Sequence, residues 1–323
     1  MPKKAKGFET VAEALRSVER STVRKKRARE RHAADVAARV PGEGYEPCIV
    51  SFIDLLGFRN LLETRHAHDI RDVLLQLREF TAPVEALPIR RMKDARLLSQ
   101  AFADSVSDAV VRVRVFDTQF NDGAFFHELL DLLHVQVECI GHGVVIRAGV
   151  AIGDAHVGLN GKGPVFGPAM VRAYEIETHE AIHPRIVVDQ AAYQSFLEDA
   201  RLRKQDHGLE EELRCVDRLL RLDGDGTRFI DYLGASESEF DDPASYFLFL
   251  ENHAELVRRK LAASTGRVRD KFEWLAAYHN SVVEDVIAEF ADGHRSAEAF
   301  MAEYEVDPEP FLRAMVISAM PAG

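Results

Sequence analysis

The sequence predicts an α+β fold, in which an antiparallel sheet with helices packed on it precedes a helical C-terminal region. Three observations indicate this fold. Apolar runs of strand length alternate with segments of helical periodicity between residues 46 and 200. Their order is strand, helix, strand, strand, helix, strand, which is the ferredoxin-like βαββαβ arrangement. From about residue 244 onward, helical patterns dominate the chain.

The first strand is predicted at residues 48–54, within the stretch IVSFIDLLGF, because β-branched and aromatic residues favour a buried strand. A helix is expected over about 55–80, where apolar residues recur at helical spacing: Ile70, Val73, Leu74, Leu77 and Phe80. The segment RLLSQAFADSVSDAVVRVRV predicts two strands around a tight polar turn. Its last part alternates valine with arginine, at Val111, Arg112, Val113, Arg114 and Val115.

The second half of the sheet follows the same logic. A second helix is predicted near 120–142, a fourth strand at VVIRAGVAI, then the glycine-rich GDAHVGLNGKGPVFG and a helix from about 168. Another strand is expected at RFIDYL. We therefore divide the chain into a basic N-terminal helix and linker at 1–45, a sheet domain at 46–200 and a mostly helical region at 201–323. Phe272, Trp274 and Tyr278 in the last region are interpreted as core or dimer contacts.

Composition and charge indicate a cytoplasmic protein. The chain of 323 residues has no apolar run long enough to span a membrane, and its N-terminus lacks the apolar core of a secretory signal. Cys48, Cys139 and Cys215 are widely spaced, which is typical of reduced thiols. No membrane partner is expected.

Positive charge is concentrated at the N-terminus. Residues 1–40 carry twelve Lys and Arg against five Asp and Glu, so the rest of the chain has a formal charge of −19 out of a total of −12. The run at residues 20–32, RSTVRKKRARERH, is either an arm for an anionic partner or a solvated helix with Glu/Arg pairs, and we favour the helix. The acidic remainder argues against direct nucleic-acid binding.

Two aspartates carry the chemistry that the sequence suggests. In the predicted topology the first strand lies in the middle of the sheet, both helices pack on one face, and the other face is free. Asp54 at the end of the first strand and Asp104 at the hairpin turn are then expected to meet at one edge. Paired carboxylates are typical ligands of two Mg²⁺ or Mn²⁺ ions, which activate an attacking oxygen and stabilise a leaving pyrophosphate.

Each of these features also has a plain structural interpretation. Asp54 is equally suited to cap a helix, Asp104 to form a turn, and GLNGKGPVFG to be a flexible loop. The order of the three favours the metal hypothesis. Between Asp54 and the helix, Gly57 permits close backbone approach, and the amides of residues 55–58 are expected to seat phosphate oxygens.

Four segments together resemble a known family. FIDLLGF, AFADSVSDAVV, IRAGVAIGDAHVG and GPVFGPAMVRAYEIE are similar, in this order, to segments of class III nucleotidyl cyclases. The similarity is strongest to the pyrimidine cyclases of bacterial Pycsar antiphage defence, and with KFEWLAAYHN it covers roughly residues 46–290. It implies a palm-type domain that converts a nucleoside triphosphate to a 3′,5′-cyclic monophosphate and pyrophosphate.

The resemblance also implies residue roles. Metal ligands would be Asp54, Leu55 and Asp104, with the two aspartates catalytic. Substrate contacts would be Phe52, Leu56, Gly57, Phe58, Arg59, Gln100, Arg172 and Tyr174.

The sequence departs from the purine cyclases of this family at the base-reading and transition-state positions. Gln100 stands where a base-reading Lys is usual, Pro164 replaces the second base reader, and Val171 and Glu175 replace an Asn and an Arg. Another cation must then stabilise the transition state, and the candidates are Arg172, Arg59 and Arg147.

Three functional hypotheses follow. The leading one is a homodimeric cyclase that makes cyclic UMP, or less favoured cyclic CMP, as a second messenger for a separate cyclic-nucleotide-binding effector in antiviral defence. The second is a catalytically inactive cyclase-like module that binds a nucleotide. The third is a dinucleotide cyclase. The sequence argues against it, because FADSVSD occupies the place of the GGDEF-like hairpin that such an enzyme is expected to have.

Overall fold

The computed structural model describes residues 22–28, 30–31, 34, 44–78, 101–106, 109–157 and 164–318. Most of the basic N-terminal segment, Phe80, Gln100, the two residues between the second and third strands, and the middle of the glycine-rich segment lie outside these residues. The predictions made for them therefore remain predictions.

The described residues form a mixed α/β structure built on one seven-stranded sheet, in the order β2-β3-β1-β4-β5-β7-β6. The strands are β1 (Glu46–Leu55), β2 (Ala101–Val106), β3 (Ala109–Val115), β4 (Ile146–Ala155), β5 (Ile186–Val188), β6 (Leu220–Leu222) and β7 (Arg228–Ile230). β1 is central and pairs antiparallel with both β3 and β4, as the sequence predicts, and β2 pairs antiparallel with β3. β5 runs parallel to β4.

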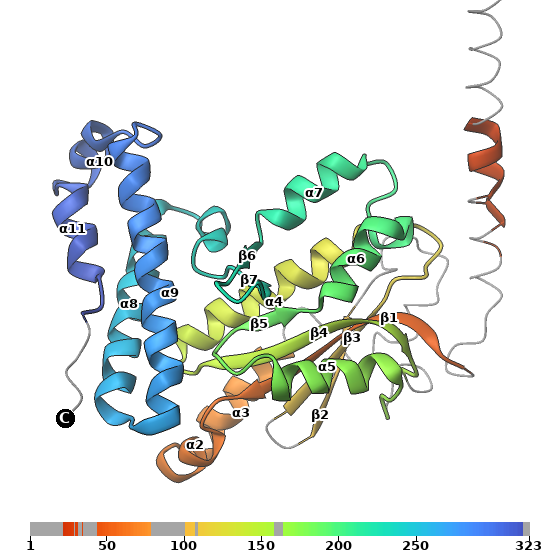
Figure 1. Ribbon diagram of the computed structural model, residues 1–323, viewed down its shortest axis with the longest axis horizontal. Helices are drawn as coiled ribbons and strands as arrows, with labels where there is room; N and C mark the ends of the chain where they lie inside the picture. Colours follow the sequence, from red (N-terminus) through yellow and green to blue (C-terminus); the bar gives the residue numbers. More distant parts are fainter. Residues whose placement is uncertain are drawn as a thin grey trace, which may run out of the picture.

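Helices cover both faces of the sheet (Figure 1). On one face, α3 (Ala67–Gln76) and α4 (Ala124–Gly141) share a hydrophobic cluster with Ile49 and Ile53 of β1. On the other, α5 (Pro168–His179) packs against Cys48 and Val50. The prediction of a free face was therefore wrong. Successive strand residues point to opposite faces, and β1 is apolar on both, so both need cover.

The helix predicted over 55–80 is shorter and divided. Strand β1 continues through Leu55, and two helices follow, α2 (Phe58–Thr64) and α3. The chain leaves the helical conformation between them, because the backbone at Arg65 and His66 is extended. Asp69 then accepts a hydrogen bond from the His66 amide at 3.3 Å, which closes a capping box that starts α3.

Small residues let α5 approach the sheet closely. Ala151 of β4 and Ala169 and Ala173 of α5 are all buried in the cluster between them. Gly149 has no side chain, and a Cβ atom there would lie 2.6 Å from Cβ of Ile176. The glycine and alanine pattern of this stretch therefore determines how near α5 lies to β4.

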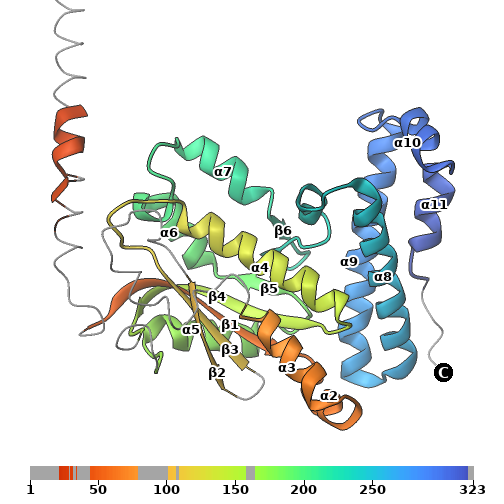
Figure 2. The ribbon, with the colours of Figure 1, turned by 180° about the vertical axis from the view of Figure 1, so that it is seen from behind.

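The C-terminal region continues the same core. α6 (Gln190–Glu198) and α7 (Leu209–Asp217) precede β6 and β7, and the chain ends in α8 (Pro243–Ala263), α9 (Gly266–Ala291), α10 (Ala297–Tyr304) and α11 (Pro308–Met315). Figure 2 shows α8 and α9 side by side at one end of the sheet. One hydrophobic cluster runs from Ile49 to Ile317 and so includes residues on both sides of the boundary expected at residue 200. Phe272 and Tyr278 are buried in this cluster.

The two arginines of β3 are buried rather than solvated. Arg112 is fully buried and Arg114 nearly so. They pair with Glu128 of α4, whose carboxylate accepts hydrogen bonds from Nε of Arg114 at 2.9 Å and from the Ser51 hydroxyl at 2.9 Å. Asp131, one helical turn later, also pairs with both arginines. The alternation of β3 therefore marks two buried faces, one apolar and one ion-paired.

The cysteines are free thiols, as the sequence predicts. Cys48 and Cys139 are buried thiols, and Cys215 is half-buried and free. None of the described helices combines the length and apolar character that crossing a membrane requires.

Candidate functional site

Asp54 lies near the end of β1, on the face that α5 covers. Its backbone is paired with Ala109 of β3 on one side and Arg147 of β4 on the other. Residues directly opposite in antiparallel strands project to the same face, so the register brings Arg147 beside Asp54. Nε of Arg147 donates a hydrogen bond to Oδ2 of Asp54 at 3.1 Å. Both side chains are largely buried, at 22% exposed for Asp54 and 19% for Arg147.

Glu177 of α5 holds the other end of the Arg147 guanidinium. Nη2 of Arg147 lies 2.6 Å from Oε1 of Glu177, and Nη1 donates to the Glu177 carbonyl oxygen at 3.3 Å. Burial raises the pKa of Glu177, Arg147 opposes this shift, and the nearby charge of Asp54 adds to it. Asp54, Arg147 and Glu177 thus form a network of two ion pairs that links β1, β4 and α5.

Lys271 of α9 lies close to this ion-pair network. It lies in the first turns of α9, is half-buried, and interacts electrostatically with Arg147, Asp54 and Glu177. Burial and the charge of Arg147 lower the pKa of Lys271, while the two carboxylates oppose the shift. The sequence alone did not associate Lys271 or Glu177 with Asp54, because both are remote from it in the chain; each lies in a segment that the sequence analysis quoted, but no role was assigned to either residue.

Asp104 is a strand residue, so its predicted position in the hairpin turn was wrong. Pairing of β2 with β3 continues through Asp104, opposite Val111, to Val106, opposite Ala109. Val111 in turn pairs with Phe52. Asp104 therefore shares a face with Asp54 but lies two strands away, about 10 Å across the sheet, and one pleat back along it. The polar residues Asp104 and Ser105 therefore belong to the paired part of β2.

The segment after Asp54 is only partly suited to hold phosphate. Leu55 is buried on the opposite face, and the Leu56 amide donates to the Val145 carbonyl at 2.9 Å, so this amide is already used. Gly57 has φ +78° and precedes α2, a conformation that favours glycine. Phe58 packs against the core, whereas Arg59 is exposed.

Two aromatic residues that were predicted to contact the substrate lie against each other. The rings of Phe52 and Tyr174 meet edge to face with centroids 5.3 Å apart. Phe52 lies in the same row of the sheet as Asp104, and Tyr174 on α5 is 49% exposed. An exposed aromatic ring such as that of Tyr174, on the same face as the two carboxylates, is a group on which a base can stack.

The candidate replacement cations differ in their surroundings. Arg172 binds Asp189 through two hydrogen bonds, at 3.1 and 3.0 Å, and lies 2.8 Å from Glu180. Releasing it for substrate would break both contacts. Val171 and Glu175 are exposed on α5, without the amide and guanidinium donors of the purine enzymes.

The donor chemistry of Asp54 and Asp104 fits hard divalent ions, which prefer carboxylate oxygens and complete their shell with backbone carbonyls, water and phosphate. Within the described ranges, no cluster of three or more Asp, Glu, His and Cys side chains is gathered to hold a metal. Any ion bound here would therefore depend on water or substrate for several ligands.

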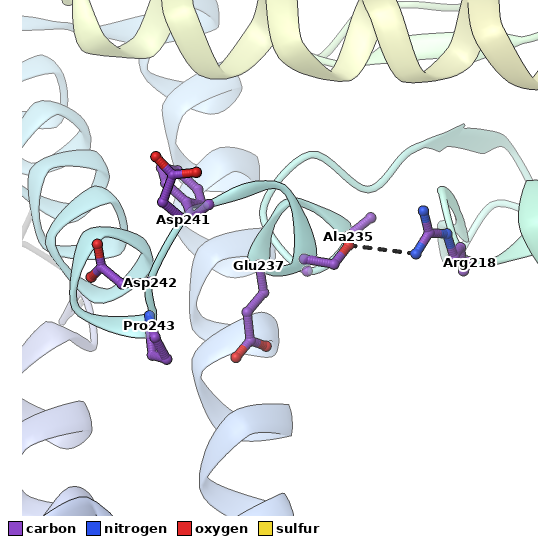
Figure 3. A pocket seen from close by; sticks show the side chains of 9 residues that line it. Arg218, Ala235, Glu237, Asp241, Asp242 and Pro243 are labelled. Atoms are coloured by element: carbon purple, nitrogen blue, oxygen red, sulfur yellow. Dashed lines mark hydrogen bonds between the residues drawn. The ribbon is translucent and has the colours of Figure 1, made fainter. Parts of the chain in front are cut away.

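The hollows identified in the described surface lie elsewhere. One, about 480 Å³, is lined by Arg218, Glu237, Asp241 and Asp242 at the start of α8 (Figure 3). Another, about 500 Å³, is lined by Pro47, Gly153 and Arg201 at the opposite end of β1. None of the predicted site residues lines either hollow. The candidate site is therefore the region around Asp54, on the face that α5 covers, and it includes neither of these two hollows.

Comparisons with known proteins find likenesses among solved structures but none among family models or curated proteins. No protein-family model matches the chain, and no curated protein is significantly similar to it. Part of the chain is similar to the monomeric crystal structure of a double mutant of the guanylyl cyclase domain of the RhoGC fusion protein, from the aquatic fungus Blastocladiella emersonii. The identity is 15%, the TM-score is 0.30, and the match covers 58% of this chain and 94% of that chain. A likeness of this degree carries no argument about activity.

Proposed function

We propose that this chain is a metal-dependent nucleotidyl cyclase whose β1–β4 sheet with α2–α4 forms a ferredoxin-like, palm-type catalytic unit. One observation carries the proposal: by strand register Asp54 and Asp104 share a face of the sheet with Phe52, whose ring contacts the half-exposed ring of Tyr174. The order of motifs noted in the sequence supports it.

The proposed reaction assigns a task to each of these residues. Asp54, Asp104 and the Leu55 carbonyl would hold two divalent ions, Mn²⁺ or Mg²⁺, which supply charge stabilisation and an activated oxygen when bound. The 3′-hydroxyl gives its proton to solvent water, its oxygen forms a bond to the α-phosphorus, and the bond between the α-phosphorus and the pyrophosphate oxygen breaks, so that pyrophosphate leaves. Gly57 would allow the triphosphate to approach the backbone, and the Phe52–Tyr174 pair would orient the base.

We propose a pyrimidine substrate, UTP in preference to CTP. The purine-reading residues are replaced by Gln100 and Pro164, and the exposed Val171 and Glu175 offer no purine-enzyme donors. The test is incubation of the protein with each of the four nucleoside triphosphates and Mn²⁺, with products identified by mass spectrometry. Cyclic UMP or cyclic CMP with pyrophosphate is expected, and formation of cyclic AMP or cyclic GMP alone would contradict the pyrimidine assignment.

The proposal extends to a homodimer acting in antiphage defence through a separate effector, on the strength of the sequence resemblance. The exposed Val171 and Tyr174 on α5 give a surface on which two copies can meet. Light scattering after size-exclusion chromatography should give twice the chain mass, and a monomer at all concentrations would contradict it.

A second candidate function is a catalytically inactive nucleotide-binding module. It is favoured by the commitment of Arg172 to Asp189 and Glu180 and by the absence of transition-state donors at Val171 and Glu175. Tight, metal-dependent binding of UTP without any cyclic product would support this candidate.

A further inference from the structure

Arg147 makes contacts that a simple surface ion pair lacks. All three guanidinium nitrogens are engaged, with Nε on the Asp54 carboxylate and both terminal nitrogens on Glu177. Glu177 is only 4% exposed, so solvent screens this contact little. The planar fork of arginine can bridge two carboxylates in a fixed geometry, which the single ammonium of lysine cannot.

The position of Arg147 follows from two independent features of the fold. The β1–β4 register sets it directly opposite Asp54. Gly149, two residues later on the same face, lets α5 approach so closely that the Glu177 backbone nitrogen would lie 2.8 Å from a Cβ atom there. Both partners of Arg147 are therefore fixed by backbone packing, and so is the direction in which the guanidinium meets Asp54.

We propose that Arg147 is a positioning residue for the Asp54 carboxylate, and that Glu177 holds Arg147 in place for this task. The inference rests on the proposed function, since it concerns the orientation of a metal-binding carboxylate. Arg147 orients the carboxylate but also places a positive charge beside a cation site. Removing Arg147 should therefore reduce turnover, because the Asp54 carboxylate is then misplaced for the reaction. Metal binding should not weaken, because the positive charge of Arg147 no longer repels the metal ion.

The experiment compares Arg147→Gln, Arg147→Lys and Glu177→Gln with the unmodified full-length protein. Turnover is measured with UTP and MnCl₂, and binding of Mn²⁺ alone is measured from the electron paramagnetic resonance signal of the free ion. We expect kcat to fall about 10- to 100-fold in Arg147→Gln, with Mn²⁺ affinity equal to or above that of the unmodified protein. The kcat of Arg147→Lys should be little higher than that of Arg147→Gln. Glu177→Gln should lower kcat by a smaller factor than Arg147→Gln does.

Arg201→Gln is the matched control. Arg201 also bridges two carboxylates, those of Asp117 and Asp199, but at the opposite end of β1 and β4. Its substitution should leave kcat within about twofold. Circular dichroism establishes the folded fraction of each variant, and Glu177→Gln carries the test if Arg147→Gln does not fold.

Three outcomes separate this inference from the function on which it rests. If Asp54→Asn is inactive but Arg147→Gln and Glu177→Gln keep kcat within threefold, Arg147 has no positioning role and the inference is overturned. A rise in kcat on removing Arg147 also overturns it, since the arginine would then block the site. If Asp54→Asn itself keeps its turnover, the proposed function fails.

Discussion

Gly149 of β4 and Ala173 of α5 approach so closely that a Cβ atom on the glycine would lie 2.3 Å from the alanine carbonyl oxygen. The helix therefore rests directly on the strand backbone at this point. Because Glu177 lies about one helical turn beyond Ala173, the same contact brings its carboxylate to Arg147 and, through Arg147, to Asp54.

Gly149→Ala should separate α5 from the sheet. The new methyl group meets backbone atoms that cannot rotate away, and overpacking of this kind costs about 1–3 kcal/mol. Urea denaturation should show this loss. Gly153→Ala is the matched control, because the nearest atom to its Cβ would be the Ala169 side chain at 3.4 Å. Equal stability of the two variants would contradict the close contact.

Asp54→Asn should abolish cyclic-nucleotide formation while leaving the fold intact. The substitution keeps the shape of the side chain and its ability to accept a hydrogen bond from Arg147, but removes the charge that a divalent ion requires. We expect turnover to fall at least about 100-fold, with a far-ultraviolet circular dichroism spectrum like that of the unmodified protein. Turnover within about tenfold of normal would exclude Asp54 as a metal ligand.

Asp104→Asn should also abolish turnover if this residue is the second metal ligand. The register sets Asp104 one pleat away from the row of Asp54 and Ala109, whereas Asp108 directly precedes Ala109 in the sequence. Asp108→Asn is therefore the informative companion variant, and it should remain active. The reverse result, an active Asp104→Asn and an inactive Asp108→Asn, would reject Asp104 and assign the second carboxylate to Asp108.

Glu128→Gln should strongly destabilise the fold. The fully buried carboxylate serves Arg112, Arg114 and Ser51, so its neutralisation leaves buried arginine charge uncompensated. Breaking a buried pair in this way costs about 3–5 kcal/mol, measurable by chemical denaturation. Glu273→Gln, which removes an exposed partner of Arg269 within α9, should cost less than about 1 kcal/mol. Similar losses in both variants would show that burial does not set the cost.

Acid should weaken the packing of α8 against α9 through a buried histidine pair. Nδ1 of His253 lies 3.1 Å from Nδ1 of His279, and the Tyr232 hydroxyl and the Met315 carbonyl satisfy the two outer ring nitrogens, which suits neutral rings. Burial lowers the pKa of His279 to about 4 and that of His253 well below its ordinary value of 6.5.

The unfolded chain therefore binds more protons than the folded chain between pH of about 6.5 and 4. Stability is fully present above this window and falls as the pH drops through it, by about 3 kcal/mol for His279 alone. Denaturation at several pH values should show this slope, and His279→Gln should reduce it. An unaltered slope in His279→Gln would contradict the assignment.

Local patterns were sufficient to predict the order and type of the main elements. The apolar run at β1, the spacing of Ile70, Val73 and Leu77, and the long helical pattern after residue 244 each report burial of one side of a segment. These signals depend on neighbours in the chain, so they can be interpreted without the fold. The same local logic also singled out Asp54 as a polar residue at the end of a buried strand.

Pairing across the sheet was decided only by the tertiary structure. The alternation in FADSVSDAVVRVRV is compatible with more than one turn position. The alternation is a property of each strand alone and does not show which residues of the two strands are paired. The structure pairs Asp104 with Val111 and so moves it from the turn into the strand. It also joins β6 and β7 to the sheet. Because these strands are short, their sequences did not indicate which strands they pair with.

The sequence by itself predicted the segments that form β1 to β4 and β7, the helical character of the main helices, and the carboxylate of Asp54 at the end of a buried strand. The tertiary structure decided which charges surround that carboxylate: Arg147 through strand register, Glu177 through the close approach of α5 at Gly149, and Lys271 through the return of α9 to the sheet. The physical reason is that side-chain periodicity records whether a residue is buried, whereas its charged partner depends on the packing of segments remote in the chain.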